Sequence, residues 1–574
     1  MQKTITRRIY KTDSPSLQLH PVLQRIYQGR GIQSQNELEK NLEHLHHWKQ
    51  LSQIHTATQL LLEAFLNKER ILIIGDFDAD GATATAIAVK ALKKFNFPEV
   101  HYLVPNRFEF GYGLTPEIVE VAARLYSPNL IITVDNGIAS HLGVETAKAL
   151  GIKVLITDHH LPGATLPPAQ AIVNPNLPQD NFESKAIAGC GVIFYVMLAL
   201  RQTLREKNLL PTEIFKLEEL LDLVALGTVA DVVPLDKNNR ILVHHGLKRI
   251  QTRRCSMGIL ALLEVAGRNP EQISSLDLGY ALAPRLNAAG RLDDMSLGIE
   301  CLLTDNPQKA QTIALQLNQL NQERKMIESQ MQQQAWQNLS SLNTNTYSTT
   351  LPFGICLYDE TWHQGVIGIL AGRIKEKLHR PSIAFAKVSE DELKGSARSI
   401  EGIHIRDCLD SIATHHPDLL QKFGGHAMAA GLTINKADFK RFSRIFNATI
   451  EKHSTPELLR AEILTDGELQ SQEITLDLAE LLQHAGPWGT AFPEPLFDNE
   501  FELLQQYLVG EKHLKMRLSL PQQNSLFDAI AFSVDLKSWP NPAVKRVRLV
   551  YRLNINEYKG SKKVQLIVDH LQVC

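Results

Sequence analysis

The sequence predicts an α/β protein whose first large domain is a doubly wound, mostly parallel sheet. Short apolar runs alternate there with helix-like segments, and glycine or polar turn residues follow each run. The runs are 71–74, 100–104, 130–134 and 154–156, and the clearest helical segment between them is 82–95. A long amphipathic helix, a second α/β domain and a small C-terminal β-barrel are expected to follow in that order.

The length and composition fit several ordinary globular domains. The chain has 574 residues, of which 44% are hydrophobic and 21% charged, and its formal net charge is -2. At roughly 150 residues per domain, this length predicts three or four domains. The balanced charge excludes a histone-like polycation and a disordered acidic chain. Six scattered cysteines without a C-x-x-C pair argue against a zinc ribbon or a disulfide scaffold, and with no secretory signal they predict a cytoplasmic protein.

Changes of pattern along the chain predict five segments. They are an N-terminal helical extension without a strong strand pattern (1–68), the first α/β domain (69–304), a connecting helix (305–340), the second α/β domain (350–456) and the barrel (460–574). In the connecting helix, apolar residues recur every three, four or seven positions, and Pro307 occupies a first-turn position. A coiled-coil arm is the alternative, but Arg324 interrupts the apolar stripe and the repeat is short.

Charge divides the predicted barrel into two halves. Residues 461–509 contain ten acidic residues and no lysine or arginine, whereas residues 510–574 contain eleven basic and five acidic residues. Lys545, Arg546 and Arg548 crowd one predicted strand, where they would meet phosphate groups. A solvated edge strand protected by basic side chains explains the same residues equally well.

The strongest chemical signal is a set of three carboxylates directly after the first apolar run. Asp76, Asp78 and Asp80 occupy alternate positions in the segment Gly-Asp-Phe-Asp-Ala-Asp-Gly. The carboxyl ends of parallel strands face the crevice used for ligands, and neighbouring carboxylates there raise one another's pKa unless a cation neutralises them. A helix N-terminus with acidic residues would explain one aspartate but not three.

Further strand ends and one apolar segment carry similar groups. These groups are Asp135 after the run 130–134, Asp158, His159 and His160 after 154–156, and Asp231 within the apolar stretch 226–234. An unpaired carboxylate in an apolar stretch is costly, so Asp231 also requires a cation. Mixed carboxylate and imidazole ligands favour Mn²⁺ over Ca²⁺, and five or more such groups can hold two ions about 4 Å apart for phosphoester hydrolysis.

These four acidic motifs together resemble the DHH phosphoesterase superfamily. Four later motifs resemble its RecJ family of exonucleases: PRLNAAGR at 284–291, WHQGVIG at 362–368, GSARS at 395–399 and GGHAMAAG at 424–431. The resemblance covers about residues 70–500, and the barrel fits by position and charge. It implies a DHH domain in the first α/β region, a DHHA1 domain in the second and an OB-like nucleic-acid-binding barrel at the C-terminus.

The resemblance implies a 5′ to 3′ exonuclease specific for single-stranded DNA, which releases 5′ mononucleotides in recombination and repair. It implies that two Mn²⁺ or Mg²⁺ ions are held by Asp78, Asp80, Asp135, His159 and Asp231. Asp76 and Asp158 would be further ligands or would orient imidazoles and water, and His160 would contact phosphate or act as an acid. Many DHH phosphatases have a histidine where this chain has Ile74, so the second ion would bind weakly, or only with substrate phosphate.

The resemblance also implies how DNA is held. Ser396 and Arg398 would anchor the 5′ phosphate, with Arg285 or Arg291 reaching from the first domain. The residues that would let the strand pass close to the backbone are Gly424, Gly425 and His426; a tight glycine turn explains the two glycines but not the histidine. Single-strand binding protein and a RecQ-type helicase would be partners of a monomeric enzyme.

Two other functions keep part of this pattern. A DHH phosphodiesterase of short oligonucleotides or cyclic dinucleotides would have the same metal site, but such proteins seldom carry a further barrel. A catalytically inactive DNA-binding scaffold would have the same fold, but it has no reason to retain costly clustered carboxylates. Metal-dependent release of mononucleotides from long strands would separate the exonuclease from both alternatives.

Overall fold

The chain forms two structural units, each described here by itself. The computed structural model describes residues 3–10, 17–106, 109–210, 215–345, 351–523, 525–558 and 560–574. The larger unit comprises Arg7–Gln319 and Thr465–Cys574, and the smaller comprises Leu320–Leu464 together with the N-terminal residues through Thr6. The first α/β domain and the C-terminal barrel therefore belong to the same unit.

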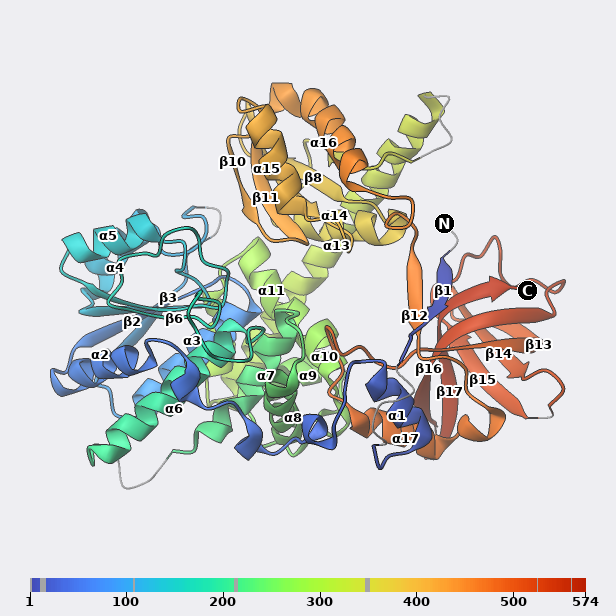
Figure 1. The fold of residues 1–574 in the computed structure, drawn as a ribbon, viewed down its shortest axis with the longest axis horizontal. Coiled ribbons are helices and arrows are strands. Elements are labelled where there is room, and N and C mark those ends of the chain that lie inside the picture. The colour runs from blue at the N-terminus through green and yellow to red at the C-terminus, as the bar shows by residue number, and fades with distance from the viewer. Residues whose placement is uncertain are drawn as a thin grey trace. The chain divides into compact units, whose positions relative to one another are not determined.

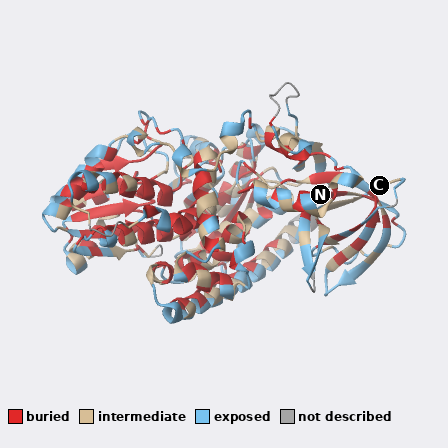
Figure 2. Ribbon diagram, turned by 90° about the horizontal axis from the view of Figure 1, so that it is seen from below, coloured by how far each residue is buried: buried red, intermediate tan, exposed pale blue. Residues whose placement is uncertain are grey.

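The first α/β domain is built on a five-stranded parallel sheet with the strand order β3-β2-β4-β5-β6. The strands are β2 (Arg70–Gly75), β3 (Glu99–Leu103), β4 (Leu130–Val134), β5 (Lys153–Thr157) and β6 (Ala171–Val173). The central strands β2, β4 and β5 are mostly apolar and buried because helices cover both faces, as Figure 2 shows. The order reverses between β2 and β4, which places a ligand crevice beyond the carboxyl ends of these two strands.

Helices pack on both faces of this sheet, as the alternating pattern predicts. In Figure 1, α4 (Pro116–Tyr126) and α5 (His141–Ala149) lie on one face, and α2 (Ile54–Leu66), α3 (Ala79–Lys94) and α6 (Gly189–Glu206) lie on the other. Ile74 packs with Ile118 and Val144 in the core under α4 and α5, so its side chain is not a metal ligand. The helices that complete the domain include α7 (Leu221–Ala230), α8 (Lys237–Gln251), α10 (Ser275–Asp277), the π-helix η6 (Leu278–Leu282) and α11 (Ala283–Leu292).

The connecting helix is longer than the sequence pattern predicts. It is α13 (Pro307–Asn345), with 39 residues, and Pro307 begins it as expected. Arg324 does not interrupt the buried stripe, because it is only 6% exposed and its charge is paired with Glu328, which also accepts a 2.9 Å hydrogen bond from Arg373 Nε. The composition change near 340–351 lies partly outside the described residues. Among those described, no helix is both long and apolar enough to span a bilayer.

The smaller unit contains the second α/β domain. Its mixed sheet has the order β10-β11-β9-β8-β7, in which only β7 and β8 pair in parallel. The elements are β7 (Ile355–Tyr358), α14 (Ile367–Leu378), β8 (Ser382–Lys387), β9 (Glu392–Arg398), α15 (Ile405–His415), β10 (Lys422–Gly425), β11 (Ala429–Asn435) and α16 (Phe439–His453). Phe385, Phe442 and Phe446 pack together at the centre of its core.

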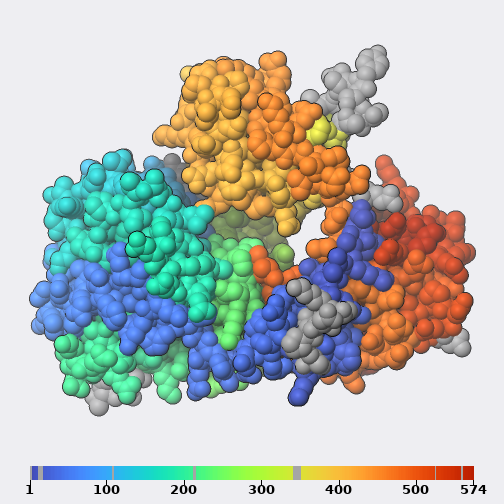
Figure 3. All heavy atoms as spheres, viewed as in Figure 1, coloured from blue at the N-terminus to red at the C-terminus, as the bar shows by residue number. Residues whose placement is uncertain are grey.

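The N-terminal segment departs from the expected helical extension because it begins with a strand. β1 (Thr4–Arg7) pairs with β12 (Glu462–Thr465), a partner too distant in sequence for a local pattern to indicate. The following α1 (Pro21–Gln28) lies beside α17 (Leu476–Ala485), and the blue N-terminal surface meets the orange C-terminal surface in Figure 3. Tyr27 donates a 2.8 Å hydrogen bond to the Ala485 carbonyl, and Arg30 pairs with Asp466 at 2.7 Å.

The C-terminal region is a closed five-stranded barrel with the order β13-β14-β15-β17-β16. Its strands are β13 (Phe497–Val509), β14 (His513–Ser519), β15 (Leu526–Ala531), β16 (Arg546–Tyr558) and β17 (Ser561–Val573). Four of them contain the strand-like runs of the sequence at 501–504, 514–518, 547–553 and 563–568. The short β15 had no clear pattern, yet its antiparallel pairing with β14 and parallel pairing with β17 close the barrel.

Candidate active site

The acidic segment after β2 forms a tight turn into α3. The Asp78 carboxylate caps that helix, because its Oδ1 accepts hydrogen bonds of 3.0 Å from the backbone N–H groups of Asp80 and Gly81. Gly81 is required here, since a Cβ atom would lie 2.4 Å from the Asp76 carbonyl oxygen. The turn therefore holds all three aspartates at the carboxyl end of the sheet, as the alternate spacing predicts.

Asp135 follows β4 on the other side of the point where the strand order reverses. Its backbone is left-handed, with a φ of 63°, a conformation that Asp and Asn tolerate better than most residues. The side chain is 2% exposed, and its Oδ1 accepts no hydrogen bond from any described residue. Gly189 lies directly against it, because a Cβ on that glycine would come within 2.5 Å of the Asp135 Cβ. A buried carboxylate oxygen held in this way is suited to a cation.

Asp158 orients the two histidines that follow it. Its Oδ2 accepts a 2.9 Å hydrogen bond from the Ile138 N–H, and its Oδ1 accepts from the backbones of His159 and His160. The same Oδ1 lies 2.7 Å from His160 Nδ1. Both Asp158 oxygens are therefore engaged, and the carboxylate positions imidazoles instead of facing a metal directly.

His159 lies between two carboxylates from different elements. Its Nε2 is 3.1 Å from Asp135 Oδ1 and 3.4 Å from Asp231 Oδ2. Asp231, the acidic residue of the fourth motif, is the C-cap of α7, so a helix end and not a strand brings it to the site. Asp80 comes from the opposite side, where its carboxylate accepts backbone hydrogen bonds of 2.7 Å from Gly189 and 3.0 Å from Cys190 at the start of α6.

The structure brings together every residue predicted to bind metal or take part in catalysis. Seven of these eight residues form three groups whose ligand atoms lie within 4.8 Å of one another: Asp80, His159 and Asp231; Asp135, His159 and His160; and Asp76, Asp78 and Asp135. Asp158 belongs to none of these groups and contacts His160 instead. Asp135 belongs to two of these groups, and a carboxylate can bridge two neighbouring cations, whereas an imidazole nitrogen such as that of His159 can bind only one. Oxygen ligands with imidazole suit Mn²⁺ or Mg²⁺.

The electrostatics of the cluster also fit a divalent cation. Burial, reinforced by the carboxylate of Asp78, raises the pKa of Asp80 to about 6. Burial and the charges of Asp80 and Asp78 raise the pKa values of Asp135 and Asp231 well above the usual range. These carboxylates repel one another in a largely buried cluster, and a bound cation would remove that cost.

His160 has the opposite electrostatic character. Burial would lower its pKa, but the hydrogen bond and charge of Asp158 outweigh burial and raise that pKa to about 9. Burial similarly opposes ionisation of Asp158, yet its contacts with His160 hold its pKa below the usual value. The two residues therefore form an ion pair at neutral pH, with a protonated imidazole at the edge of the acidic cluster.

Tyr112 is a site residue that the sequence interpretation missed. It lies between Gly111 and Gly113, both left-handed with a φ of 78°, in the loop after β3. Its hydroxyl is 3.4 Å from His160 Nδ1 and 3.5 Å from the carbonyl oxygen of Asp135. Although the residue is 50% exposed, its hydroxyl lies among the carboxylates of the site, and the loss of hydration there together with their charges raises its pKa well above the ordinary value, so the phenol stays protonated. The available sequence signal was its place in the loop after a strand of the parallel sheet.

Comparison with known proteins decides the family. The family model described as the DHH family, N-terminal domain, matches residues 70–228, the DHHA1 domain matches 351–452 and the RecJ OB domain matches 465–570. The chain is 52% identical to the single-stranded-DNA-specific exonuclease RecJ of Salmonella typhimurium, over 96% of both chains. It is 51% identical to the protein of that name from Escherichia coli, over 98% of both chains. The chain belongs to the RecJ family.

A solved structure of this family has the same fold. RecJ of Thermus thermophilus in complex with Mn²⁺ is 30% identical, with a TM-score of 0.78, and the match covers 96% of this chain and 76% of that one. The α/β class, the DHH and DHHA1 domains and the C-terminal OB barrel expected from the sequence are therefore confirmed.

The RecJ motif at 284–291 supports the acidic turn in this structure. Asn287 Oδ1 accepts a 2.8 Å hydrogen bond from the Ala79 N–H, at the first residue of α3. Gly290 lies so close to the turn that a Cβ would be 1.8 Å from the Phe77 carbonyl oxygen. Arg285 is engaged locally, with its Nε 3.0 Å from Asn318 Oδ1 and its Nη1 2.5 Å from the Ala281 carbonyl oxygen, while Arg291 lies in the last turn of α11.

We expect Asn287→Ala to weaken Mn²⁺ binding roughly tenfold, because the turn that carries Asp78 and Asp80 loses its outer support. Isothermal titration with Mn²⁺ would measure this loss. The matched control is Asn239→Ala, since Asn239 caps a different loop through the Ala186 and Pro234 carbonyls. Equal Mn²⁺ affinities for Asn287→Ala and wild type would exclude this supporting role.

The residues predicted to anchor a 5′ phosphate lie together in the smaller unit. Ser396 and Arg398 are on β9. Gly368, near the start of α14, lies against both of them, because a Cβ atom added to this glycine would be 2.9 Å from each side chain. Arg398 donates to Ser396 Oγ at 3.2 Å and to the Ala397 carbonyl at 2.8 Å, and no described carboxylate pairs with it. Burial lowers the pKa of this guanidinium, so an anion would stabilise it.

The other predicted DNA-binding residues have mixed surroundings. Gly424, Gly425 and His426 lie at the β10–β11 hairpin, next to β9, where Gly425 has a φ of 143° and a Cβ would clash with the following strand. The hairpin itself therefore requires glycine at position 425, whether or not a DNA strand passes there. On the barrel, Lys545 and Arg546 are exposed, but Arg548 is paired with Asp498 at 2.7 Å and is only partly available to phosphate.

Proposed function

We propose that this chain is a metal-dependent 5′ to 3′ exonuclease of single-stranded DNA that releases 5′ mononucleotides in recombination and repair. Membership of the RecJ family and the names of its relatives support activity on single-stranded DNA. The observation that carries the chemistry is the buried cluster of carboxylates and imidazoles, within which Asp135 Oδ1 accepts no hydrogen bond from a described residue.

We assign the divalent cations to the five residues Asp78, Asp80, Asp135, His159 and Asp231. When bound, Mn²⁺ or Mg²⁺ would lower the pKa of a water molecule and neutralise charge on the phosphate. Asp76 would complete the group with Asp78 and Asp135, and Asp158 would fix the imidazoles. Two ions are expected, because Asp135 belongs to more than one group and its carboxylate can bridge them.

His160 would supply the acid of the reaction. Its Nδ1 is held by Asp158, and its raised pKa keeps the imidazole protonated at neutral pH, so the proton on Nε2 is available to the leaving 3′ oxygen. Tyr112 remains neutral, so its oxygen can accept from the protonated ring while its O–H points to the Asp135 carbonyl, which would help to orient the imidazole. No nucleophilic side chain is needed, because water attacks the phosphorus.

The polarity of the reaction would come from the 5′ phosphate anchor. Ser396, Arg398 and the start of α14 form an anion site with an unneutralised guanidinium, and the DNA strand would continue past Gly424, Gly425 and His426. Arg285 and Arg291 from the larger unit, and Lys545, Arg546 and Arg548 on the barrel, are proposed as further backbone contacts. The six cysteines are free thiols, which supports the proposed cytoplasmic location. By resemblance to the RecJ family, we also propose a monomer that works with single-strand binding protein and a RecQ-type helicase.

The decisive experiment is digestion of single strands labelled at either end, in Mn²⁺, Mg²⁺ or EDTA, with products resolved by length. Mononucleotides released from the 5′ end only with metal are the expected result. Cleavage of dinucleotides but not of long strands would indicate a short-substrate phosphodiesterase. DNA binding without any cleavage would indicate a scaffold.

We expect Arg398→Ala to raise the KM for 5′-phosphorylated strands about 10- to 100-fold, because hydrogen bonds to charged groups contribute about 1.5–3 kcal/mol. Strands with a 5′ hydroxyl should be affected much less. Steady-state kinetics on both substrates would measure the difference. Arg441→Ala is the matched control, since Arg441 is exposed in the same unit and paired with Asp418 at 2.6 Å. Equal losses on both kinds of end would exclude the anchor.

A further inference from the structure

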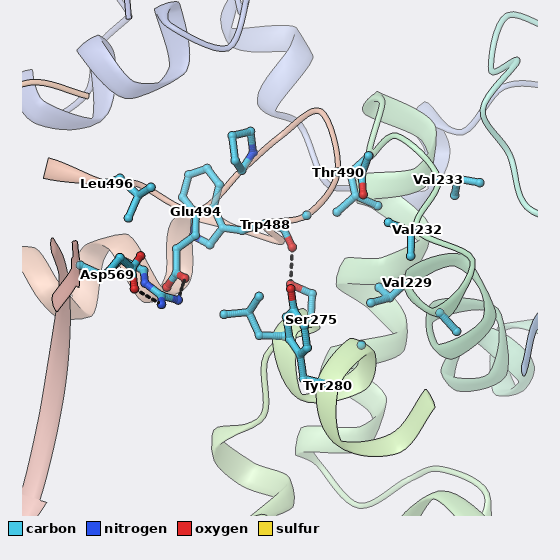
Figure 4. Close-up of a pocket in the computed structure, with 17 residues that line it drawn as sticks. Val229, Val232, Val233, Ser275, Tyr280, Trp488, Thr490, Glu494, Leu496 and Asp569 are labelled. Carbon is cyan, nitrogen blue, oxygen red and sulfur yellow. Dashed lines mark hydrogen bonds and ion pairs between the residues drawn. The ribbon is translucent and has the colours of Figure 1, made fainter. Parts of the chain in front are cut away.

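The larger unit contains a cavity of about 600 Å³ next to the metal-site residue Asp231. Figure 4 shows that its walls come from the end of α7, the π-helix η6, the linker before the barrel and the barrel itself. Its lining includes Val232, Tyr280, Glu494, Arg552 and Asp569. Its volume lies within the range of about 300–1,000 Å³ that small-ligand sites occupy.

Two irregular features of the backbone meet at this cavity. Val232, the residue after Asp231, has a left-handed φ of 60°, which is costly for a β-branched side chain. Tyr280 lies in the π-helix, a rare conformation that often marks a functional position. These two side chains are 65% and 81% exposed, so neither contributes much to the core. Strained or rare backbone that displays apolar side chains at one pocket indicates a ligand with an apolar face.

The opposite wall decides which part of a nucleotide can enter. Arg552 lies between two carboxylates, 2.8 Å from Glu494 and 2.6 Å from Asp569. One cation between two anions leaves this wall negative, so it repels a phosphate group. Carboxylate oxygens accept hydrogen bonds from the amino and imino groups of nucleobases. A nucleobase therefore fits the pocket, and the phosphate backbone would stay at its rim.

We propose that this pocket binds one nucleobase of the substrate strand, stacked on Tyr280 and on the 3′ side of the bond that is cleaved. This inference rests on the proposed exonuclease function. The pocket extends from the residues flanking Asp231 to the barrel, which is expected to hold the strand further from its 5′ end. Base stacking on an exposed aromatic ring is tolerant of sequence, as a general exonuclease requires.

Binding of oligonucleotides with a single abasic site would test the pocket. Fluorescence anisotropy would measure affinity in EDTA, where no cleavage is expected, with the abasic site moved one position at a time from a 5′-phosphorylated end. We expect one position at which losing the base weakens wild-type binding roughly tenfold. Tyr280→Ala should bind the intact strand about as weakly as wild type binds the strand that lacks the base at this position. Removing that base should not weaken binding by Tyr280→Ala any further, whereas Tyr280→Phe should retain the wild-type profile.

The matched control is Leu125→Ala, which removes a side chain that is 61% exposed in the last turn of α4. It should leave the abasic profile unchanged. A flat profile for wild type, equal losses at all positions for Tyr280→Ala, or loss of the profile in Tyr280→Phe would overturn the base pocket. Failure of the exonuclease proposal is distinguishable, because wild-type protein with Mn²⁺ would then not shorten the strands at all.

Discussion

Asp135→Asn is expected to reduce the rate of cleavage by about 1,000-fold or more while stabilising the metal-free protein. The carboxylate is buried, accepts no hydrogen bond at Oδ1 from the described residues, and lies in the field of Asp80 and Asp78. An amide at this position removes a repelled charge at the cost of a metal ligand. Asparagine also tolerates the φ of 63°, so the backbone should not change. The kcat at saturating DNA and thermal unfolding in EDTA would measure the two effects.

Asp180→Asn is the matched control for this prediction. Asp180 is also buried, but its Oδ2 accepts from Ser52 N and Oγ at 2.6 Å, and its Oδ1 accepts from the Phe182 N–H at 2.8 Å. Its replacement should destabilise the fold by about 1–3 kcal/mol and leave the Mn²⁺-induced shift in unfolding temperature intact. If Asp135→Asn instead retains that shift, or loses as much stability as Asp180→Asn in EDTA, then Asp135 serves the fold and not the metal.

Asp80 both supports the fold and faces the proposed metal ligands, so loss of activity on its replacement does not by itself identify a metal ligand. Its two oxygens accept the Gly189 and Cys190 N–H groups at the start of α6, while it also faces His159 and Asp231. Alanine at this position should therefore lower stability as well as activity. Asn retains one acceptor for the helix, so the difference between Asp80→Ala and Asp80→Asn separates capping from catalysis.

The parts of the site that can be predicted from the sequence are those that depend only on neighbouring residues in the chain. Apolar runs determine the strands, and a parallel strand presents whatever follows it at one edge of the sheet, so Asp76, Asp135 and Asp158 converge without any knowledge of contacts. Asp231 was predicted from the cost of an unpaired carboxylate in an apolar stretch. That argument is independent of element type, so it applies even though a helix end brings the residue to the cluster.

The parts that sequence did not predict depend on partners far along the chain. Arg548 is engaged by Asp498, and β1 requires β12, pairings that no local pattern contains. Asn287 and Gly290 belong to a motif expected to contact DNA through its arginines, yet their visible contacts are with the acidic turn. Tyr112 was missed because a lone tyrosine between glycines gives no chemical signal until its distance to His160 is known.

The second large effect is a loss of stability as pH rises when metal is removed, which is the opposite of what paired carboxylates usually produce. Asp80, with a folded-state pKa of about 6, contributes stability that is present below its ordinary value of 3.8 and is lost as pH rises through 6. Asp135 and Asp231, whose pKa values are raised further, act in the same direction at higher pH. His160 adds to the trend, because its contribution is present below 6.5 and is lost as pH rises through about 9. In EDTA, the free energy of unfolding should therefore fall between pH 5.5 and 8, by on the order of 2 kcal/mol.

Saturating Mn²⁺ should oppose this trend, because metal binding requires the deprotonated carboxylates that destabilise the metal-free protein. At a hundred times the dissociation constant, a bound ion stabilises the fold by about 2.7 kcal/mol, and tighter binding at pH 8 should make the shift larger there than at pH 5.5. Denaturant unfolding at both pH values, with EDTA and with Mn²⁺, gives four free energies of unfolding. The cross-difference is the stabilisation by Mn²⁺ at pH 8 minus the stabilisation by Mn²⁺ at pH 5.5. It isolates the site, because carboxylates elsewhere contribute equally with and without metal. A cross-difference near zero would mean that the acidic cluster is neutralised by its own protons and histidines and does not require a cation. In Asp135→Asn the cross-difference should shrink while Asp180→Asn leaves it unchanged, which assigns the effect to this cluster.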